Sequence, residues 1–308
     1  MRAKLLLMPL AVALLGLTAC DIEDFGSFQR YQRDFHYSYP LKRGGRVSVE
    51  GFNGSVEISG WDQDSVDVSG IKYGPTQEAA DALKIDVQNS PDEVSIRAVR
   101  PSDRRNNQGA RFTIKIPRTA VLERITTSNG AIRTLDGKGP ARMRTSNGMI
   151  RVQDLAGNVE ATTSNASVEL VNVDGDASVH SSNGHIRAER LGGSLEASTS
   201  NASITASIGE SNRPVRLETS NGSVDLTLPP HFASDVHVSS NNAPITLHMP
   251  DQPNARLIAH TSNSSITTDY EIRTQGGASK NQVEGTLGSG GGLIDLGTSN
   301  GSIRLLRM

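Results

Sequence analysis

Hydrophobic and polar positions alternate over short stretches of this chain, and the alternating stretches recur at a fixed distance. A Ser-Asn-Gly triplet or a close variant occurs at Asn129 and then every 18 residues as far as Asn201, after which the spacing loosens. Such a period is the sequence signature of a repeat protein. The copies are marked by Asn129, Asn147, Asn165, Asn183, Asn201, Asn221, Asn242, Asn263 and Asn300.

The residues on both sides of each triplet predict two short strands per repeat. A hydroxyl residue stands two positions before every asparagine, as Thr163 does before Asn165. Positions four and six before the asparagine are mostly apolar or Ala, and the third position after it is apolar again. Alternation with a period of two residues is typical of a strand that is buried on one face. We therefore predict a strand before and a strand after each triplet, and we call the triplet the corner.

Two packings are compatible with these strands. Asn-Gly favours a tight hairpin turn, which would give an antiparallel meander. A hairpin of that type needs positive φ at both turn residues, but Ala replaces Gly at Ala166 and Ala202. In a solenoid, equivalent residues stack at about 4.8 Å per coil, and recurring Thr and Asn residues form ladders of side-chain hydrogen bonds. In a meander, nothing would require the same residue types at equivalent positions of every repeat, so we predict the solenoid.

The predicted fold is all-β, a single-stranded β-helix or β-solenoid with about 18–21 residues per coil. Only 4% of residues are aromatic and 35% are hydrophobic, which suits a thin core shared between neighbouring coils. We assign residues 127–308 to this array, with a loop insertion at 270–292. Residues 41–126 read as a β-rich N-terminal subdomain, continuous with the array, that carries one short helix at 76–84.

The N-terminus predicts export and lipidation. Arg2 and Lys4 precede an apolar run that is too short for a comfortable membrane span, and small residues lead into Cys20, the only cysteine. Residues 1–19 resemble the signal peptide of a bacterial lipoprotein, in which Cys20 would carry the lipid that anchors the chain to the membrane. Residues 20–40 are rich in Phe and Tyr, and we expect them to form a tether at the lipid headgroups or a cap over the first coil.

The order of motifs resembles the DUF4097 family of bacterial envelope proteins, which contain β-strand repeats and carry an adhesin label. The resemblance rests on Gly60-Trp61-Asp62, on the acidic short helix, on Ile116-Pro117 and on the serial Thr-Ser-Asn-Gly units, and it spans residues 40–308. It implies an adhesin-like role and brings no catalytic residues. The insertion at 270–292 and the variant Asn241-Asn242-Ala243-Pro244 depart from the family pattern.

Candidate chemistry is sparse. No histidine stands with a Cys or a carboxylate at metal-ligand spacing, and no phosphate-binding loop or nucleophile elbow occurs, so we expect no metal, no cofactor and no catalytic residue. The formal net charge is −2 with acids and bases interspersed, which does not indicate a nucleic-acid partner.

Three functions fit this sequence. The leading hypothesis is a non-enzymatic, membrane-anchored binding protein of the cell envelope, whose repeated polar face contacts a glycan, another envelope protein or a neighbouring cell through many weak contacts. The second is a structural or stress-signalling scaffold of the envelope. The third is a carbohydrate-active enzyme on a β-helix, which would require two carboxylates from adjacent coils within about 10 Å of each other.

Overall fold

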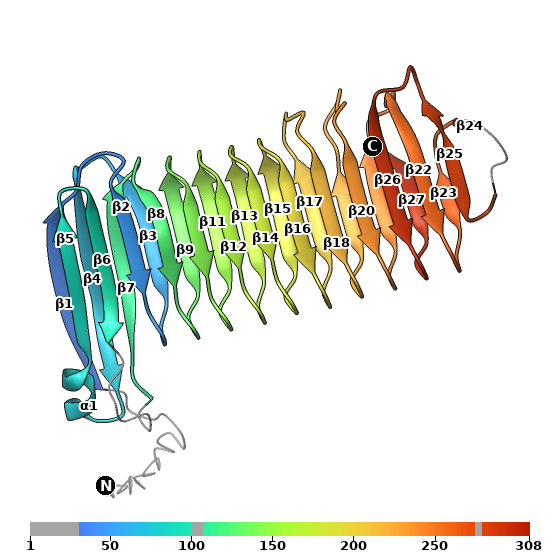
Figure 1. Ribbon diagram of the computed structural model, residues 1–308. Coiled ribbons are helices and arrows are strands. Elements are labelled where there is room, and N and C mark those ends of the chain that lie inside the picture. The colour runs from blue at the N-terminus through green and yellow to red at the C-terminus, as the bar shows by residue number, and fades with distance from the viewer. Residues whose placement is uncertain (1–30, 100–106, 275–278) are drawn as a thin grey trace, which may run out of the picture.

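The computed structural model describes residues 31–99, 107–274 and 279–308. The predicted signal peptide (1–19) and the predicted lipidation site Cys20 lie outside the described residues. In the described part, two long sheets run side by side along a straight rod (Figure 1). No helix within these residues has the length and apolar character needed to cross a membrane.

Sheet A has 13 strands and contains the second strand of each coil. In spatial order, its strands are β1 (Tyr31–Pro40), β4 (Ser65–Gly74), β7 (Gly109–Pro117), β3 (Val56–Trp61), β9 (Ile132–Gly137), β11 (Ile150–Leu155), β13 (Val168–Val173), β15 (Ile186–Leu191), β17 (Ile204–Ile208), β19 (Val224–Thr227), β21 (Ile245–Met249), β27 (Ile303–Arg307) and β23 (Ile266–Thr268).

Sheet B has 14 strands and contains the first strand of each coil. From the opposite end of the rod, its strands are β24 (Arg273–Thr274), β25 (Gln282–Leu287), β22 (Ala255–Thr261), β26 (Gly292–Thr298), β20 (Val236–Ser240), β18 (Val215–Thr219), β16 (Leu195–Thr199), β14 (Ala177–His180), β12 (Val159–Thr162), β10 (Ala141–Arg144), β8 (Val121–Thr126), β2 (Arg46–Glu50), β6 (Glu93–Val99) and β5 (Lys84–Ser90).

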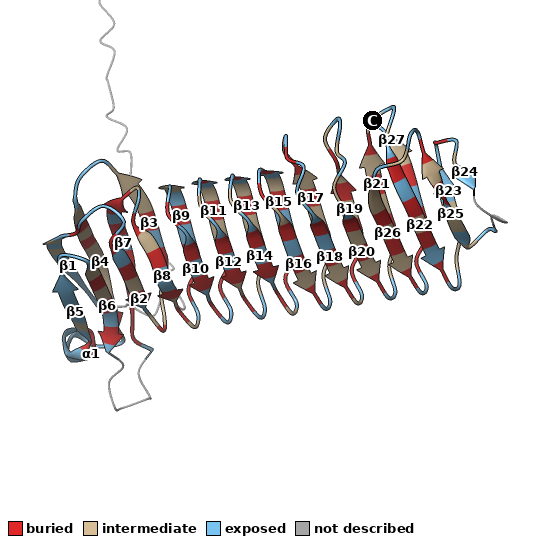
Figure 2. Cartoon of the chain, turned by 45° about the horizontal axis from the view of Figure 1, so that its top comes forward, coloured by how far each residue is buried: buried red, intermediate tan, exposed pale blue. Residues whose placement is uncertain are grey.

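Parallel pairing between successive coils confirms the solenoid and excludes the meander. In sheet B, β10 pairs in parallel with β12, and β12 with β14, without slippage. In sheet A, β11 pairs in the same way with β13, and β13 with β15. Each strand turns one row of side chains inward, as Val159 and Ala161 do on β12 and Val168 and Leu170 on β13. These rows form one continuous hydrophobic core along the rod (Figure 2).

The corner residues hold neighbouring coils together in two ways. Each corner asparagine donates from its Nδ2 to the Oδ1 of the asparagine in the neighbouring coil, at 2.6–2.9 Å, so the predicted asparagine ladder exists and begins at Asn53. The hydroxyl residues do not bond to one another. Each donates to a backbone carbonyl of the neighbouring coil instead, as Thr163 does to Gly148 at 3.1 Å.

Positive φ does not explain the corners, although Asn-Gly tolerates it. The described non-glycine residues with positive φ lie elsewhere. Four of them are the last but one residue of the second strand in successive coils, namely Asp136, Asp154, Asn172 and Arg190. The corner asparagine instead fits the amide ladder, because its NH2 group donates to one neighbour while its carbonyl oxygen accepts from the other.

The order of coils departs from the order of the sequence at both ends of the rod. The coil formed by β2 and β3 lies between the coil of β6 and β7 and that of β8 and β9. At the other end, the coil of β26 and β27 lies between the coil of β20 and β21 and that of β22 and β23. Asn300 therefore bonds to Asn242 on one side and to Asn263 on the other.

The ends of the rod are covered by antiparallel strands. β1 pairs antiparallel with β4, and its half-buried Phe35 packs edge-on against Phe112 with ring centroids 5.6 Å apart. The described part of residues 20–40, from Tyr31 onwards, is this strand at one end of sheet A. Residues 270–292, predicted as a loop insertion, contain β24 and β25, of which β25 pairs antiparallel with β22. The predicted helix is present as α1 (Gln77–Ala82), and Thr76 caps it by accepting from the Ala79 amide.

Candidate binding groove

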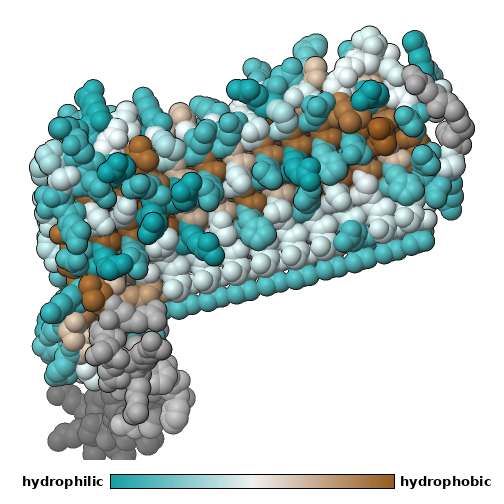
Figure 3. All heavy atoms as spheres, in the orientation of Figure 1, coloured by the Kyte–Doolittle hydropathy of each residue, from teal (hydrophilic) through white to brown (hydrophobic). Residues whose placement is uncertain are grey.

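The predicted corner asparagines lie in one straight row along an edge of the rod, which Figure 3 shows as a hydrophilic line. All nine are exposed, but each amide is engaged with its neighbours in the ladder. Their regular spacing is therefore explained by the contacts between coils. The corners are a structural element, and a ligand site has to be sought on the outward positions, which differ from coil to coil.

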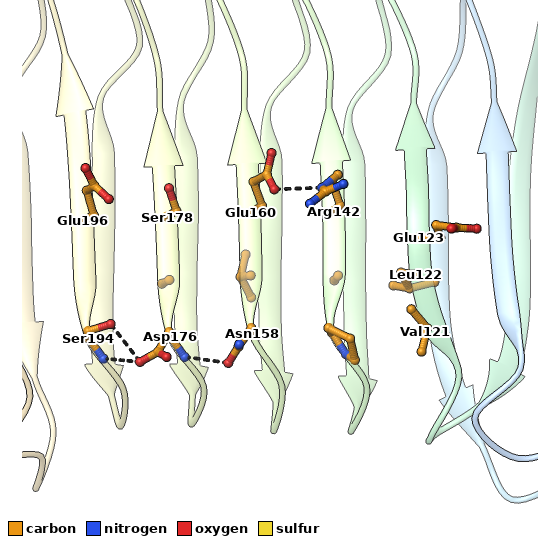
Figure 4. Close-up of a pocket in the computed structure, with 14 residues that line it drawn as sticks. Val121, Leu122, Glu123, Arg142, Asn158, Glu160, Asp176, Ser178, Ser194 and Glu196 are labelled. Carbon is orange, nitrogen blue, oxygen red and sulfur yellow. Dashed lines mark hydrogen bonds and ion pairs between the residues drawn. The ribbon is translucent and has the colours of Figure 1, made fainter.

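The outer face of sheet B is hollowed where its strands begin. Two open hollows of about 560 Å³ and 540 Å³ share Asp176, Ser194 and Glu196, so they form one groove. The groove runs across eight neighbouring strands, from β8 to β26, and Figure 4 shows the part from β8 to β16. At about 4.8 Å between strands, its length is roughly 34 Å.

Two rows of side chains line the groove, and sheet register places them. The first row, which we call the strand row, occupies one outward position per strand: Arg142, Glu160, Ser178, Glu196, Arg216, His237 and Asp295. The second, which we call the loop row, directly precedes each strand: Pro140, Asn158, Asp176, Ser194, Pro214 and Asp235. Because side chains two positions apart point to the same face of a strand, the two rows run parallel along the rod.

The loop row is held in place by hydrogen bonds to the backbone of the next coil. The Asp176 amide donates to Asn158 Oδ1 at 3.0 Å, and the Ser194 amide donates to Asp176 Oδ1 at 2.9 Å. The Ser194 hydroxyl donates to the same carboxylate at 2.7 Å. These bonds, led by the Ser194 amide, lower the pKa of Asp176 below its usual value, so this carboxylate is ionised at neutral pH.

The strand row carries charges of both signs. Arg142 contacts Glu160 at 2.7 Å, and His237 contacts Asp295 at 3.0 Å. Between these pairs, Glu196 makes no ion pair or hydrogen bond to any other described residue. The middle of the groove therefore presents a free carboxylate beside Ser178, with hydrogen-bonding groups on both sides.

The strand row carries two glutamates in its middle part, one of which is paired. Glu160 and Glu196 share the strand row with Ser178 between them, which puts their strands about 10 Å apart. The Arg142 guanidinium neutralises Glu160, and the groove is open. Among the described residues, no three His, Cys, Asp or Glu side chains gather closely enough to hold a metal ion.

The sequence predicted a repeated polar face but did not identify this groove. The strand row is visible in the sequence as the position five residues before each corner asparagine, such as Glu160 before Asn165. The loop row cannot be recognised in the sequence by residue type, because Pro, Asn, Asp and Ser all occur in it. Only the pairing of the strands shows that the two rows lie beside one hollow.

No family model and no curated protein matches the chain. Among solved structures, it is similar to a “putative cell adhesion protein” from Clostridium sporogenes, with 11% identity over 90% of this chain and 100% of that chain and a TM-score of 0.29. It is also similar to a “putative adhesin” from Bacteroides fragilis, with 14% identity over 89% of this chain and 97% of that chain and a TM-score of 0.30.

Proposed function

We propose that this chain is a non-enzymatic, adhesin-like binding protein that holds an elongated ligand along the groove of sheet B. The observation that carries the proposal is the continuity of the groove, since its two hollows share Asp176, Ser194 and Glu196. A compact ligand would need only one hollow. A groove that presents a polar residue of the strand row on each of seven successive strands suits a ligand that is itself extended and repetitive.

A glycan strand is the ligand class that fits best. The groove offers a polar group at about every 4.8 Å along the rod, and one sugar unit of an extended glycan advances by a similar length. Asn158, Ser178 and Glu196 supply donors and acceptors for hydroxyl groups. The strands of the groove are paired on both sides, so an extended peptide cannot add to them as a further strand. Many weak contacts of equal spacing then add through multivalency.

The groove can be tested with the soluble chain 21–308 on a glycan array. Ser178→Arg places a long cationic side chain in the strand row and is expected to abolish binding of the glycan that the unchanged chain selects. Thr205→Arg is the matched control, because Thr205 occupies an outward position of β17 on sheet A. Equal loss of binding in both variants would contradict the assignment of the ligand to sheet B.

The same array separates the alternatives. A chain that binds no glycan would favour a structural or stress-signalling scaffold of the envelope, whose partner is another envelope protein. A bound glycan that is shortened during incubation would favour a carbohydrate-active enzyme, and Glu196→Gln would then be the first variant to examine, because Glu196 is the unpaired carboxylate of the strand row.

We further propose that lipid on Cys20 anchors the rod to a membrane of the bacterial cell envelope. The sequence before Cys20 supports this, since a basic start, an apolar run and small residues lead directly to the only cysteine. Cys20→Ser, or inhibition of lipoprotein signal peptidase with globomycin, is expected to release the chain from the membrane fraction or to block its processing. Unchanged fractionation and processing would refute the anchor.

A further inference from the structure

The coil of β26 and β27 occupies a slot between two coils that precede it in the sequence. β26 pairs in parallel with β20 on one side and with β22 on the other. β27 pairs in the same way with β21 and β23. After β23, the chain therefore turns back and enters the stack between coils that are already joined to each other.

The two coils beside the slot are joined across it without the inserted coil. Residues 250–254 connect β21 directly to β22 and span the position that β26 and β27 fill, whereas the shorter segment 156–158 connects β11 to β12. Tyr270 adds a second link, because its hydroxyl lies 2.8 and 3.0 Å from the Met249 and Pro250 carbonyl oxygens and can donate its one proton to either. A hollow of about 130 Å³, lined by Phe232, Pro253 and Ile294 among others, remains beside this connection.

An empty slot would expose two strand edges on each sheet and the apolar faces of both neighbours. The coil that fills it buries Ile294, Leu296, Ile303 and Leu305, each at 3% exposure or less. It also carries Asn300, which continues the amide ladder across the slot. Unpaired edges and apolar surface of this kind favour capture of another strand. The sequence that fits the slot is that of residues 292–307 themselves.

A glycine-rich hinge connects this coil to the rest of the rod. β25 and β26 pair on opposite sides of β22, so residues 288–291 cross the end of β22. Gly288, Gly290 and Gly291 adopt positive φ there, and the Ser289 amide donates to Asn254 Oδ1 at 2.8 Å. Glycine adopts many backbone conformations at little steric cost, so the hinge can open without any change in the contacts that the coil makes in a slot.

We propose that this slot accepts residues 292–307 of a second copy of the chain as well as its own, so that two rods exchange coils and become joined at this end. The exchanged and closed forms contain the same strand pairs and differ in the hinge, which is the condition that makes exchange of an element between copies inexpensive. The proposal does not depend on the ligand of the groove.

Cross-linking between copies tests the exchange. Both copies carry Cys20→Ser, so that introduced cysteines are the only thiols. One copy carries Ser239→Cys and the other Gly297→Cys, which are register partners on β20 and β26, and a Cβ at position 297 meets no atom within 4 Å. Refolding the two full chains together at high concentration, followed by mild oxidation, is expected to give a species of twice the chain mass on a non-reducing gel.

The matched control pair is Thr162→Cys in one copy and His180→Cys in the other. These residues are register partners on β12 and β14, in the middle of the array, where exchange would require the rod to unravel. No dimer is expected from this pair. Equal cross-linking in both pairs would show unspecific assembly and overturn the proposal. A second outcome would also overturn the proposal: no dimer from the Ser239→Cys and Gly297→Cys pair, although a single chain that carries both cysteines closes its own disulfide.

Shortening the hinge gives a second measurement that needs no disulfide. Deleting Gly288, Ser289 and Gly290 leaves only residue 291 between β25 and β26. Two Cα steps of about 3.8 Å cannot span the roughly 9.6 Å between strands on opposite sides of β22, whereas the coil can still reach the slot of another copy. Light scattering is expected to show a shift from monomer to dimer. A chain that stays monomeric after this deletion contradicts the exchange.

Discussion

At each corner, the hydroxyl residue and the asparagine contact the neighbouring coil in different surroundings. Thr163 is 1% exposed, and its hydroxyl is bonded to the Gly148 carbonyl. Asn165 is exposed, and water can replace the amide partner that a mutation removes. A buried polar group left without a partner costs more free energy than an exposed one. The two most regular features of the repeat should therefore contribute unequally to stability.

We predict that Thr163→Val lowers the free energy of unfolding by about 1–3 kcal/mol, because the buried Gly148 carbonyl loses its donor. Asn165→Ala, two positions away in the same corner, should cost about 0.5–1.5 kcal/mol. Urea unfolding of the two variants and the unchanged chain, monitored by circular dichroism, measures the difference. A larger loss for Asn165→Ala would mean that the exposed amide ladder, and not the buried hydroxyl, dominates the contact between coils.

His185 should make the rod sensitive to mild acid. Burial, followed by the nearby charge of Arg187, lowers the pKa of His185 below the value of 6.5. Because the folded state binds a proton on this ring less readily than the unfolded state does, stability is complete above pH 6.5 and is lost as the pH falls below it. Thermal melting midpoints should fall between pH 6.5 and pH 5 in the unchanged chain, and His185→Gln should reduce that fall.

His180→Gln is the control for this pH series. His180 also contacts a serine of the next coil, Ser198 Oγ at 2.8 Å, just as His185 contacts Ser203 Oγ at 2.8 Å, but the His180 side chain is exposed. Its acid response is compared with that of His185→Gln, and the reduced response is expected only in His185→Gln. An unchanged acid response in His185→Gln would assign the effect to other groups.

At the scale of elements, the sequence predicts strands and corners well, because each is determined by residues close together in the chain. The alternation around Asn165 defines β12 and β13, and Thr76 marks the start of α1. The order of coils is not encoded locally. The corner at Asn300 is equivalent to the corner at Asn263, so nothing in the motif itself shows that the later one lies between Asn242 and Asn263.

The same argument explains why the groove could not be predicted in full. Its strand row follows the repeat and can be read as the outward residues that vary between coils. The loop row, with Pro140, Asn158 and Asp176, shares no residue type, and its members become neighbours only through the pairing of strands. A surface made from residues 18 positions apart is visible in sequence only where those residues are alike.

Tyr270 should stabilise the end of the rod out of proportion to a single side chain. Its hydroxyl reaches the Met249, Pro250 and Leu306 carbonyls, and burial raises its pKa to about 12, so it remains a donor at neutral pH. Tyr270→Phe is expected to cost about 1–3 kcal/mol, because the hydrogen bond that the buried hydroxyl donates to one of these carbonyls is lost. Tyr31→Phe, at a tyrosine that is 48% exposed, is the matched control in thermal melts. Equal melting points for the two variants would contradict this role.

At the scale of the whole molecule, the coils stack in a straight line, so outward residues at equivalent positions of successive coils form one long surface. The ladder of asparagines on one edge and the continuous core inside keep the coils in register from β8 to β26. The outward positions of the strand row are thereby not needed to fill the core and can vary. A rigid surface of this kind pays little conformational entropy when a ligand binds along it, which favours many weak contacts over one strong one.

This arrangement predicts how affinity should depend on ligand length. If each coil contributes about one net hydrogen bond, worth about 1 kcal/mol, each added sugar unit should tighten Kd roughly fivefold while it still contacts a new coil. The gain should stop once the ligand spans the eight strands of the groove. Calorimetry with a length series of the glycan selected on the array measures this. If the affinity is already maximal for a di- or trisaccharide, the ligand binds in one hollow only. That result would contradict the proposal that the ligand lies along the whole groove.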